Sequence, residues 1–110
     1  METNKKIKEL YLDGNKIIKE LYLGVYKNIK DFTPIFKLEK LENLNVCDTN
    51  ISDISFLENN KNIKKLNLYY CKNIKDFTPI SKLEKLEYLD IRNNNIPDNI
   101  LNKKDIRIIK

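Results

Sequence analysis

The stretch from Ile63 to Asp90, IKKLNLYYCKNIKDFTPISKLEKLEYLD, decides the fold of this chain. It closely matches a second stretch, residues 18–45, IKELYLGVYKNIKDFTPIFKLEKLENLN, and both contain NIKDFTPI and KLEKLE unchanged. A looser copy, LENLNVCDTNISDISFLENNKN, occupies residues 41–62. Self-similarity at a regular spacing indicates a repeat protein. The repeats are 23, 22 and 23 residues long before the fourth one opens, and they begin at Ile18, Leu41, Ile63 and Leu86.

Apolar residues follow two different spacings within each repeat. The first set stands at repeat positions 1, 4 and 6, and the alternation of positions 4 and 6 predicts a short strand with one buried face. Its members are Ile18, Leu21, Leu23, Leu41, Leu44, Val46, Ile63, Leu66, Leu68, Leu86, Leu89 and Ile91. The second set recurs every three residues, which is typical of a tight helical turn. Its members are Ile29, Phe32, Ile35, Leu38, Ile51, Ile54, Leu57, Ile74, Phe77, Ile80 and Leu83, and Asn60 stands where Leu38 and Leu83 stand in the neighbouring repeats.

Signals for the start of a helical turn lie just before the second set. Two Thr-Pro pairs, at residues 33–34 and 78–79, place a capping residue before a proline at the first helical position. Asp31, Asp53 and Asp76 come directly before these turns, where a carboxylate can accept hydrogen bonds from the backbone. We therefore expect every repeat to form a short strand, a loop and a short 3₁₀ or α turn. Stacked units of this kind make a parallel sheet on one face and helical turns on the other, with the core between them.

Residues 86–96, LEYLDIRNNNI, fit the pattern LxxLxLxxNxI. By this pattern the chain resembles the leucine-rich repeat family, and its continuation with Asp and Phe-x-Pro-Ile is similar to the 22-residue class of bacterial internalins. CKNIKD, at residues 71–76, is similar to the cysteine-containing type of repeat. The resemblance covers residues 18–110 and implies an α/β solenoid with short parallel strands on its concave face and 3₁₀ or α turns on its convex face. It also implies binding of a protein partner. The length of 110 residues predicts a single domain over residues 1–110.

The resemblance further implies a role for one residue in each turn after a strand. In the family, an asparagine there links the buried turns of neighbouring coils, because backbone groups at that depth have no water to bond. The corresponding residues here are Tyr26, Thr49, Cys71 and Asn94. Only Asn94 matches, Thr49 and Cys71 are poorer substitutes, and Tyr26 is too bulky to act alike. We interpret Cys71 as a buried structural thiol.

The first 17 residues are expected to cap the amino-terminal edge of the sheet. IKELYL occurs at residues 7–12 and again at 18–23, and the link between the two copies is too short for a parallel crossover. Asp13 and Gly14 in that link are typical of a hairpin turn. We predict that residues 7–12 pair antiparallel with residues 18–23. The alternative is a short amphipathic helix over residues 4–12 that covers the same edge.

At the other end of the chain, Ile106, Ile108 and Ile109 predict a truncated strand over residues 106–110. An exposed apolar edge strand favours pairing with another copy, so a weak homodimer is expected there. A structural or assembly element that self-associates through uncapped solenoid ends is therefore an alternative function for the chain.

Side chains that alternate with the buried positions form the outer sheet face, which is the concave face of a solenoid. Five of the six tyrosines fall on this face, and Tyr26 does not. Tyrosine provides a large contact area with a polar tip and is enriched at interfaces, whereas strand propensity alone would not select the outer side. We predict that this face binds a protein partner through Tyr11, Glu20, Tyr22, Asn45, Lys65, Asn67, Tyr69, Tyr70, Tyr88, Asp90 and Arg92.

The net charge of +5 favours attraction to polyanions or to acidic membranes. The lysines, however, fall mainly on the returning side of each repeat among glutamates, whereas the tyrosines fall on the opposite face. A nucleic-acid surface would combine cations and aromatic rings on one face, so polyanion or nucleic-acid binding through the Lys-rich convex side is the least favoured alternative. No apolar run approaches the roughly 20 residues of a membrane span, and the start of the chain lacks a signal-peptide pattern. Two cysteines without such a signal predict a reduced, cytoplasmic protein.

Catalytic chemistry has little support in the sequence. The chain contains no histidine, which removes the usual general base and the usual partner of a catalytic cysteine. Two cysteines without histidine do not complete a zinc site. The only glycines, Gly14 and Gly24, do not form a phosphate-binding loop. We therefore expect a protein that is not an enzyme and that has no catalytic residues, metal site or cofactor.

Overall fold

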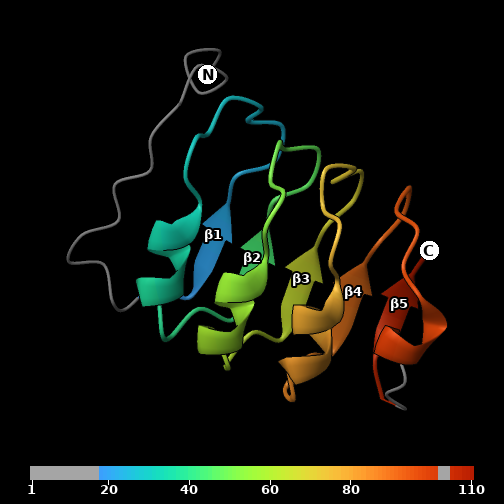
Figure 1. Ribbon diagram of the computed structural model, residues 1–110. Coiled ribbons are helices and arrows are strands. Elements are labelled where there is room, and N and C mark those ends of the chain that lie inside the picture. The colour runs from blue at the N-terminus through green and yellow to red at the C-terminus, as the bar shows by residue number, and fades with distance from the viewer. Residues whose placement is uncertain (1–17, 102–104) are drawn as a thin grey trace.

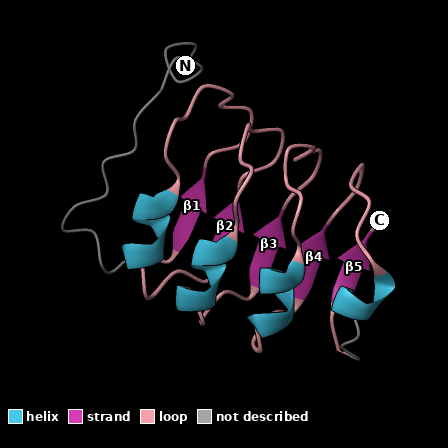
Figure 2. Ribbon diagram, viewed as in Figure 1, coloured by secondary structure: helices cyan, strands magenta, loops and turns pink. Residues whose placement is uncertain are grey.

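The computed structural model describes residues 18–101 and 105–110, and it shows a stack of coils (Figure 1). Each coil runs from a short strand through a loop into a 3₁₀ helix, so that the strands lie on one side and the helices on the other (Figure 2). The strands form one parallel sheet in chain order and span β1 (Glu20–Tyr22), β2 (Asn43–Asn45), β3 (Lys65–Asn67), β4 (Tyr88–Asp90) and β5 (Arg107–Ile109). The helices are η2 (Thr33–Lys37), η3 (Ser55–Asn59), η4 (Thr78–Lys82) and η5 (Asp98–Leu101). The predicted solenoid of parallel strands and 3₁₀ turns is confirmed.

The register of the sheet places the same repeat position side by side in every coil. Leu21 pairs with Leu44, which pairs with Leu66 and then with Leu89, and Ile108 continues the row on β5. In the three central strands these leucines are at most 1% exposed and contact the apolar side chains of the helical side. Burying one such side chain contributes about 1.5–3 kcal/mol. Because the core runs through all the coils, each coil depends on its neighbours for burial.

An aspartate two residues before the first helical residue organises each of the first three helices. Asp31 Oδ1 accepts a hydrogen bond from the Thr33 N–H at 2.9 Å, and Asp53 and Asp76 do the same for Ser55 and Thr78. Hydrogen bonds from the side chains and backbone N–H groups of Thr33, Thr78 and Ser55 lower the pKa of all three carboxyls. The predicted role of the aspartates is therefore confirmed. The prediction that threonine caps the turn is wrong, because the helices already include Thr33 and Thr78 and no side-chain cap is formed at the preceding residue.

Asn60 is a buried polar residue within the apolar core. It is 0% exposed, and its Nδ2 donates to the carbonyl oxygens of Ile35 and Leu38 in the preceding coil, both at 3.0 Å. Asn50 and Asn62 make similar bonds to the same coil, to the carbonyls of Ile29 and Glu39 at 2.7 and 2.8 Å. The repeat that departs most from its neighbours in sequence is thus tied to the first repeat by three asparagine side chains.

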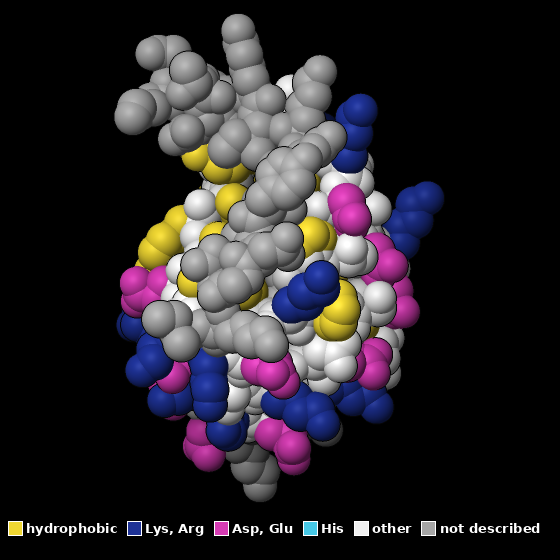
Figure 3. Space-filling model, turned by 90° about the vertical axis from the view of Figure 1, so that its left-hand side faces the viewer, with side chains coloured by type: hydrophobic (Ala, Val, Ile, Leu, Met, Phe, Trp, Pro, Cys, Tyr) yellow, Lys and Arg dark blue, Asp and Glu magenta, His cyan; other side chains and the backbone are white. Residues whose placement is uncertain are grey.

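The described part of the sheet begins at β1. The hairpin predicted for residues 7–12, its helical alternative and Tyr11 all lie outside the described residues. At the end of the molecule nearest β1, lysine and acidic side chains lie close to one another, so that neither sign forms a continuous patch in this view (Figure 3). Among the described residues, no helix has the length and apolar character needed to cross a membrane.

Candidate binding face

The outer sheet face carries three columns of side chains, one for each of repeat positions 3, 5 and 7. The sheet register aligns Glu20, Asn43, Lys65, Tyr88 and Arg107 in the first column and Tyr22, Asn45, Asn67, Asp90 and Ile109 in the second. Gly24, Cys47, Tyr69 and Arg92 follow the strands in the third column. A Cβ at Gly24 would lie 2.8 Å from Cys47 Sγ, so the absence of a side chain there allows neighbouring coils to approach closely. The described part of the predicted binding set therefore lies on these strands and in the turns that follow them.

A groove of about 280 Å³ crosses the middle of this face. We name it the tyrosine groove, and it is lined by Tyr22, Asn43, Asn45, Lys65, Leu66, Asn67 and Tyr88. The Tyr22 side is open, since that residue is 56% exposed, and its hydroxyl accepts a hydrogen bond from Asn43 Nδ2 at 3.0 Å. Tyr88 on β4 is half-buried. The two tyrosines therefore flank a floor that is made mainly of amide side chains.

The second-column side chains fix the turns that follow the strands. Asn45 Oδ1 accepts the N–H of Cys47 at 3.0 Å, and Asn67 Oδ1 accepts the N–H of Tyr69 at 2.9 Å. Asp90 makes the corresponding bond to the N–H of Arg92 at 3.2 Å. The bonds of Asn45 and Asn67 orient the two side-chain amides. The amide oxygens are engaged with the backbone, and the Nδ2 groups have no protein partner within the described ranges. Sequence reasoning missed this role, although a polar Asx residue two positions before the turn was a usable signal.

A cluster of aromatic and charged side chains lies beyond the carboxyl ends of β3 and β4. The Arg92 guanidinium stands 4.8 Å from the centre of the Tyr69 ring, and the Tyr69 and Tyr70 ring centres are 6.3 Å apart. Arg92 also contacts the Asp90 carboxylate through Nε at 3.0 Å and through Nη2 at 2.7 Å. Burial raises the pKa of Asp90, but the bonds from Arg92 outweigh that effect and leave the pKa below its ordinary value. Asp90 is itself 1% exposed, so its effect on the outer sheet face is indirect: it holds Arg92 against Tyr69.

The residue at repeat position 8 adopts a left-handed backbone conformation in every coil. The φ angles are 65° at Val25, 50° at Asp48, 54° at Tyr70 and 63° at Asn93. Asn and Asp tolerate this region, whereas a β-branched or bulky residue there is an outlier that costs free energy. Tyr70 adopts it while remaining 38% exposed, with Lys72 Nζ 5.2 Å from its ring centre. Because the same conformation follows β1 to β4, it is a feature of the repeat, and Tyr70 is a predicted binding residue that adopts it.

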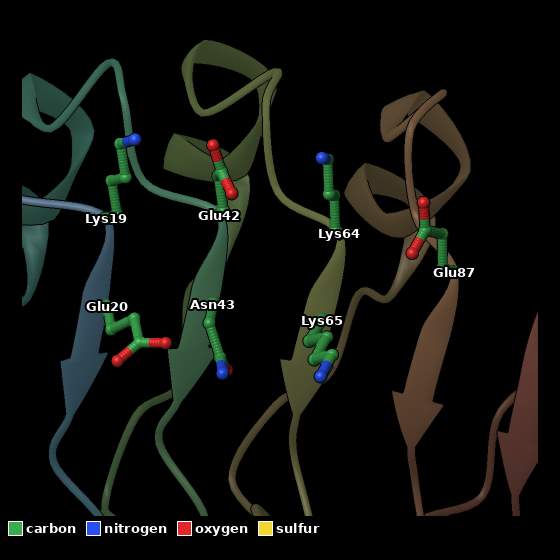
Figure 4. Close-up of a pocket in the computed structure, with 7 residues that line it drawn as sticks. All are labelled: Lys19, Glu20, Glu42, Asn43, Lys64, Lys65 and Glu87. Atoms are coloured by element: carbon green, nitrogen blue, oxygen red, sulfur yellow. The ribbon is translucent and has the colours of Figure 1, made fainter.

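A second hollow of about 530 Å³ lies at the amino-terminal ends of the strands and shares Asn43 and Lys65 with the tyrosine groove. Six charged side chains line it, and the four that stand just before the strands alternate in sign from coil to coil: Lys19, Glu42, Lys64 and Glu87 (Figure 4). We name these four residues the charged rim. Because neighbouring members have opposite charges, the rim is neutral as a whole.

The comparisons with known proteins agree with this geometry. The sequence profile described as leucine-rich repeats in two copies matches residues 39–81, and the profile of a single leucine-rich repeat matches residues 85–103, so together they match more than half of the chain. The chain belongs to the leucine-rich repeat family. No curated protein matches the chain significantly.

Several solved structures of leucine-rich repeat proteins are similar to the chain. An internalin (InlF) from Listeria monocytogenes is 33% identical, with a TM-score of 0.71 over 79% of this chain and 25% of its own. Internalin C2 of the same organism is 27% identical, with a TM-score of 0.71 over 88% of this chain and 43% of its own. A leucine-rich repeat protein of Leptospira interrogans has a TM-score of 0.72 over 96% of this chain and 31% of its own, and at 23% identity it shows the fold alone. The chain thus spans less than half of the length of each of these proteins.

The asparagine position of the leucine-rich repeat is filled here by residues that differ in their bonds. Asn94 Nδ2 donates to the Leu68 carbonyl of the preceding coil at 2.6 Å, which is the bond expected from the family. Cys71 Sγ lies 3.0 Å from the Val46 carbonyl and makes the same link between coils. Thr49 bonds to Val46 within its own coil, at 2.8 Å, and Tyr26 is a half-buried residue packed against the core. The substitution of thiol for amide at Cys71 therefore preserves the connection between coils.

The two cysteines are free thiols in different surroundings. Cys71 is 0% exposed, and burial raises its pKa to about 11, as expected for a structural thiol. Cys47 is half-buried in the third column, and desolvation together with the charges of Asp48 and Asp90 raises its pKa as well. Thiolates are the reactive form, so neither residue is activated as a nucleophile. Within residues 18–101 and 105–110, no group of three or more His, Cys, Asp or Glu side chains is placed to hold a metal ion.

Proposed function

We propose that the outer sheet face is a protein-binding surface and that the chain is a protein-interaction module. Membership in the leucine-rich repeat family supports the general role, because repeat solenoids bind on extended surfaces of this kind. The observation that carries the assignment to this face is the tyrosine set. Tyr22 and Tyr88 line the groove, and Tyr69 stands in the third column with the Tyr70 ring centre 6.3 Å from its own.

The energetics of interfaces support the same choice. Tyrosine and arginine are enriched among the residues that dominate binding free energy, and truncating such a residue typically costs more than about 1 kcal/mol of binding. Arg92 is stacked on Tyr69 and bonded to Asp90 before any partner arrives. A side chain that is already ordered loses less conformational entropy on binding. Tyr69 and Arg92 are therefore the pair that we expect to contribute most.

The test is capture of a partner by the tagged full chain, followed by titration of that partner against single variants. We expect Tyr22→Ala, Tyr69→Ala and Tyr88→Ala each to weaken binding by about fivefold or more, since about 1 kcal/mol corresponds to that factor. Phe36→Ala is the matched control, because Phe36 is an aromatic residue that is 39% exposed on η2, on the opposite side of the molecule. Unchanged affinity in all three tyrosine variants, or a loss confined to the Phe36 variant, would exclude the outer sheet face.

Self-association through the β5 edge is the second candidate function. In the described sheet β5 pairs with β4 on one side only, and its Ile108 is half-buried. An unpaired strand edge can take up a further strand. Sedimentation over a range of concentrations would show association that the Ile108→Asp variant abolishes. A single monomeric species at all concentrations would count against this candidate.

A further inference from the structure

We propose that the tyrosine groove accepts an acidic side chain from an extended segment of the protein partner. This inference rests on the proposed function and adds the chemistry of the ligand.

Two amide side chains on the floor of the groove, those of Asn45 and Asn67, present hydrogen-bond donors. The Oδ1 atoms of Asn45 and Asn67 accept bonds from the backbone N–H groups of the following turns, at 3.0 and 2.9 Å. Their Nδ2 groups are therefore the polar atoms left for a ligand, and the two residues are neighbours in the sheet register. An amide NH₂ donates and does not accept. A carboxylate, which only accepts, is the complementary group.

Lys65 adds a positive charge to this floor. Its side chain is exposed, and the described residues provide no ion-pair partner for it, since their salt bridges are Lys27–Asp48 and Arg92–Asp90. Its neighbours in the first column, Asn43 and Tyr88, are uncharged. Glu20 lies two strands away, roughly 10 Å at the usual strand spacing, and that distance is close to the screening length of physiological salt. Lys65 is therefore available to an incoming anion.

The surrounding charges favour a single carboxylate over a polyanion. Asp90 is already neutralised by Arg92, and the charged rim beside the groove alternates in sign. A nucleic acid needs several cations along its backbone, and here Glu42 and Glu87 would face its phosphates. One acidic side chain can reach Lys65 and the two amides without meeting the rim.

The width of the groove sets the length of the segment. Tyr22 lies on β1 and Tyr88 on β4, so they are three strands apart, or about 14 Å at the usual strand spacing. An extended chain covers that distance in about four residues. The segment that fits therefore has an acidic residue at its centre and an apolar residue on each side, which packs against a tyrosine ring.

The experiment uses the full chain, labelled with ¹⁵N, and two capped peptides, Leu-Ser-Glu-Ser-Leu and its glutamine counterpart. We expect the glutamate peptide to bind about tenfold more tightly or better, because it adds a charge-assisted hydrogen bond. The side-chain NH₂ signals of Asn45 and Asn67 should shift during that titration. A single-stranded DNA oligonucleotide is titrated in parallel.

Two variants and their matched controls test the donors. Asn67→Asp keeps an acceptor for the Tyr69 N–H, as Asp90 does for Arg92 in the next coil, but it replaces the donor with a carboxylate oxygen. Lys65→Gln removes the charge. The controls are Asn73→Asp, at an exposed residue beyond the turn, and Lys64→Gln, on the charged rim. We expect both groove variants to lose the preference for glutamate and both controls to keep it.

Several results would overturn the proposal: equal binding of the two peptides, no binding of the glutamate peptide at millimolar concentration, or shifts of other amides only. DNA that shifts the same amides while the glutamate peptide does not would overturn it as well. If a captured partner depends on Tyr22 and Tyr88 but binds Asn67→Asp as well as the wild type, the acidic ligand is wrong and the binding face stands. If the tyrosine variants bind normally too, both are wrong.

Discussion

Replacing Asn93 with valine tests the left-handed turn that follows each of the strands β1 to β4. Asn93 has a φ of 63°, is exposed, and occupies the same repeat position as Val25 and Tyr70. Its side chain makes no hydrogen bond within the part of the chain that the structure describes. The substitution therefore changes the backbone preference of the residue while leaving the core and the bonds between coils intact.

The size of the expected loss of stability follows from the free-energy cost of the left-handed backbone region. An L-residue in that conformation loses roughly 1–2 kcal/mol, and a β-branched residue is among the least tolerated there, whereas asparagine is several-fold enriched. We expect Asn93→Val to lower the free energy of unfolding by about 1 kcal/mol. In a domain of this size that corresponds to a decrease of about 4–8 °C in the melting temperature. Asn93→Gly should cost less than the valine variant, because glycine adopts positive φ without steric penalty.

The assay is urea unfolding followed by circular dichroism. The slope of the free energy of unfolding against urea concentration should be the same in all variants, so that a shift of the midpoint reports a change in stability. Asn95→Val is the control, because it introduces the same side chain at an exposed residue that lacks a positive φ. That control should stay within about 0.5 kcal/mol of the wild type. If Asn93→Val is no less stable than Asn95→Val, the turn carries no conformational cost, and the reasoning that Tyr70 is held in a strained geometry is refuted.

Three other outcomes follow from the core and the titrating groups. Asn60→Ala should lower the free energy of unfolding by about 2–3 kcal/mol, because two buried hydrogen bonds are lost and a cavity is left. Asn60→Leu, which introduces the residue found in the neighbouring repeats, should lower it by less. Equal losses for the two variants in chemical denaturation would contradict this. Cys71 should resist alkylation in the folded protein at pH 8, since its pKa is about 11, and it should react only on unfolding. The half-buried Cys47 should react slowly in the folded protein. Rapid alkylation of Cys71 in the native protein, detected by mass spectrometry, would be the contrary result. The pKa of Asp90 is lowered in the folded protein, so its bond to Arg92 contributes stability at pH values above the unfolded pKa of about 3.9. This stability is lost as the pH falls through the folded pKa. Asp90→Asn should therefore flatten the acid limb of a plot of stability against pH, and an unchanged limb would contradict the assignment.

The apolar pattern was sufficient to predict the strands, the 3₁₀ turns and their stacking. Leu44, Leu66 and Leu89 recur at one position of each repeat, and only a parallel sheet places all three inside one core. The aspartates before the helices were equally predictable, because their side chains bond locally, to residues two positions on. Local and periodic features can be read from sequence, since the interacting groups are close in the chain or related by the repeat.

Features that depend on contacts between coils were harder to predict. Asn60 interrupts the apolar pattern, and only the structure shows that it bonds to Ile35 and Leu38 of the preceding coil. Asp90 was predicted to contact a partner directly, whereas it is buried beneath Arg92. The amide orientation of Asn45 and Asn67 was also missed, although it determines which polar atoms the groove presents. In each case the side chain has two plausible uses, and the choice between them depends on a neighbour in space.

The most direct test of the binding face is a hydrogen-exchange footprint of the captured partner on the full chain. We expect protection of the backbone amides at residues 20–26, 43–48, 65–70 and 88–92, with little change over η2, η3 and η4. Protection confined to η2, η3 and η4, or to the edge of β5, would contradict binding on the outer sheet face.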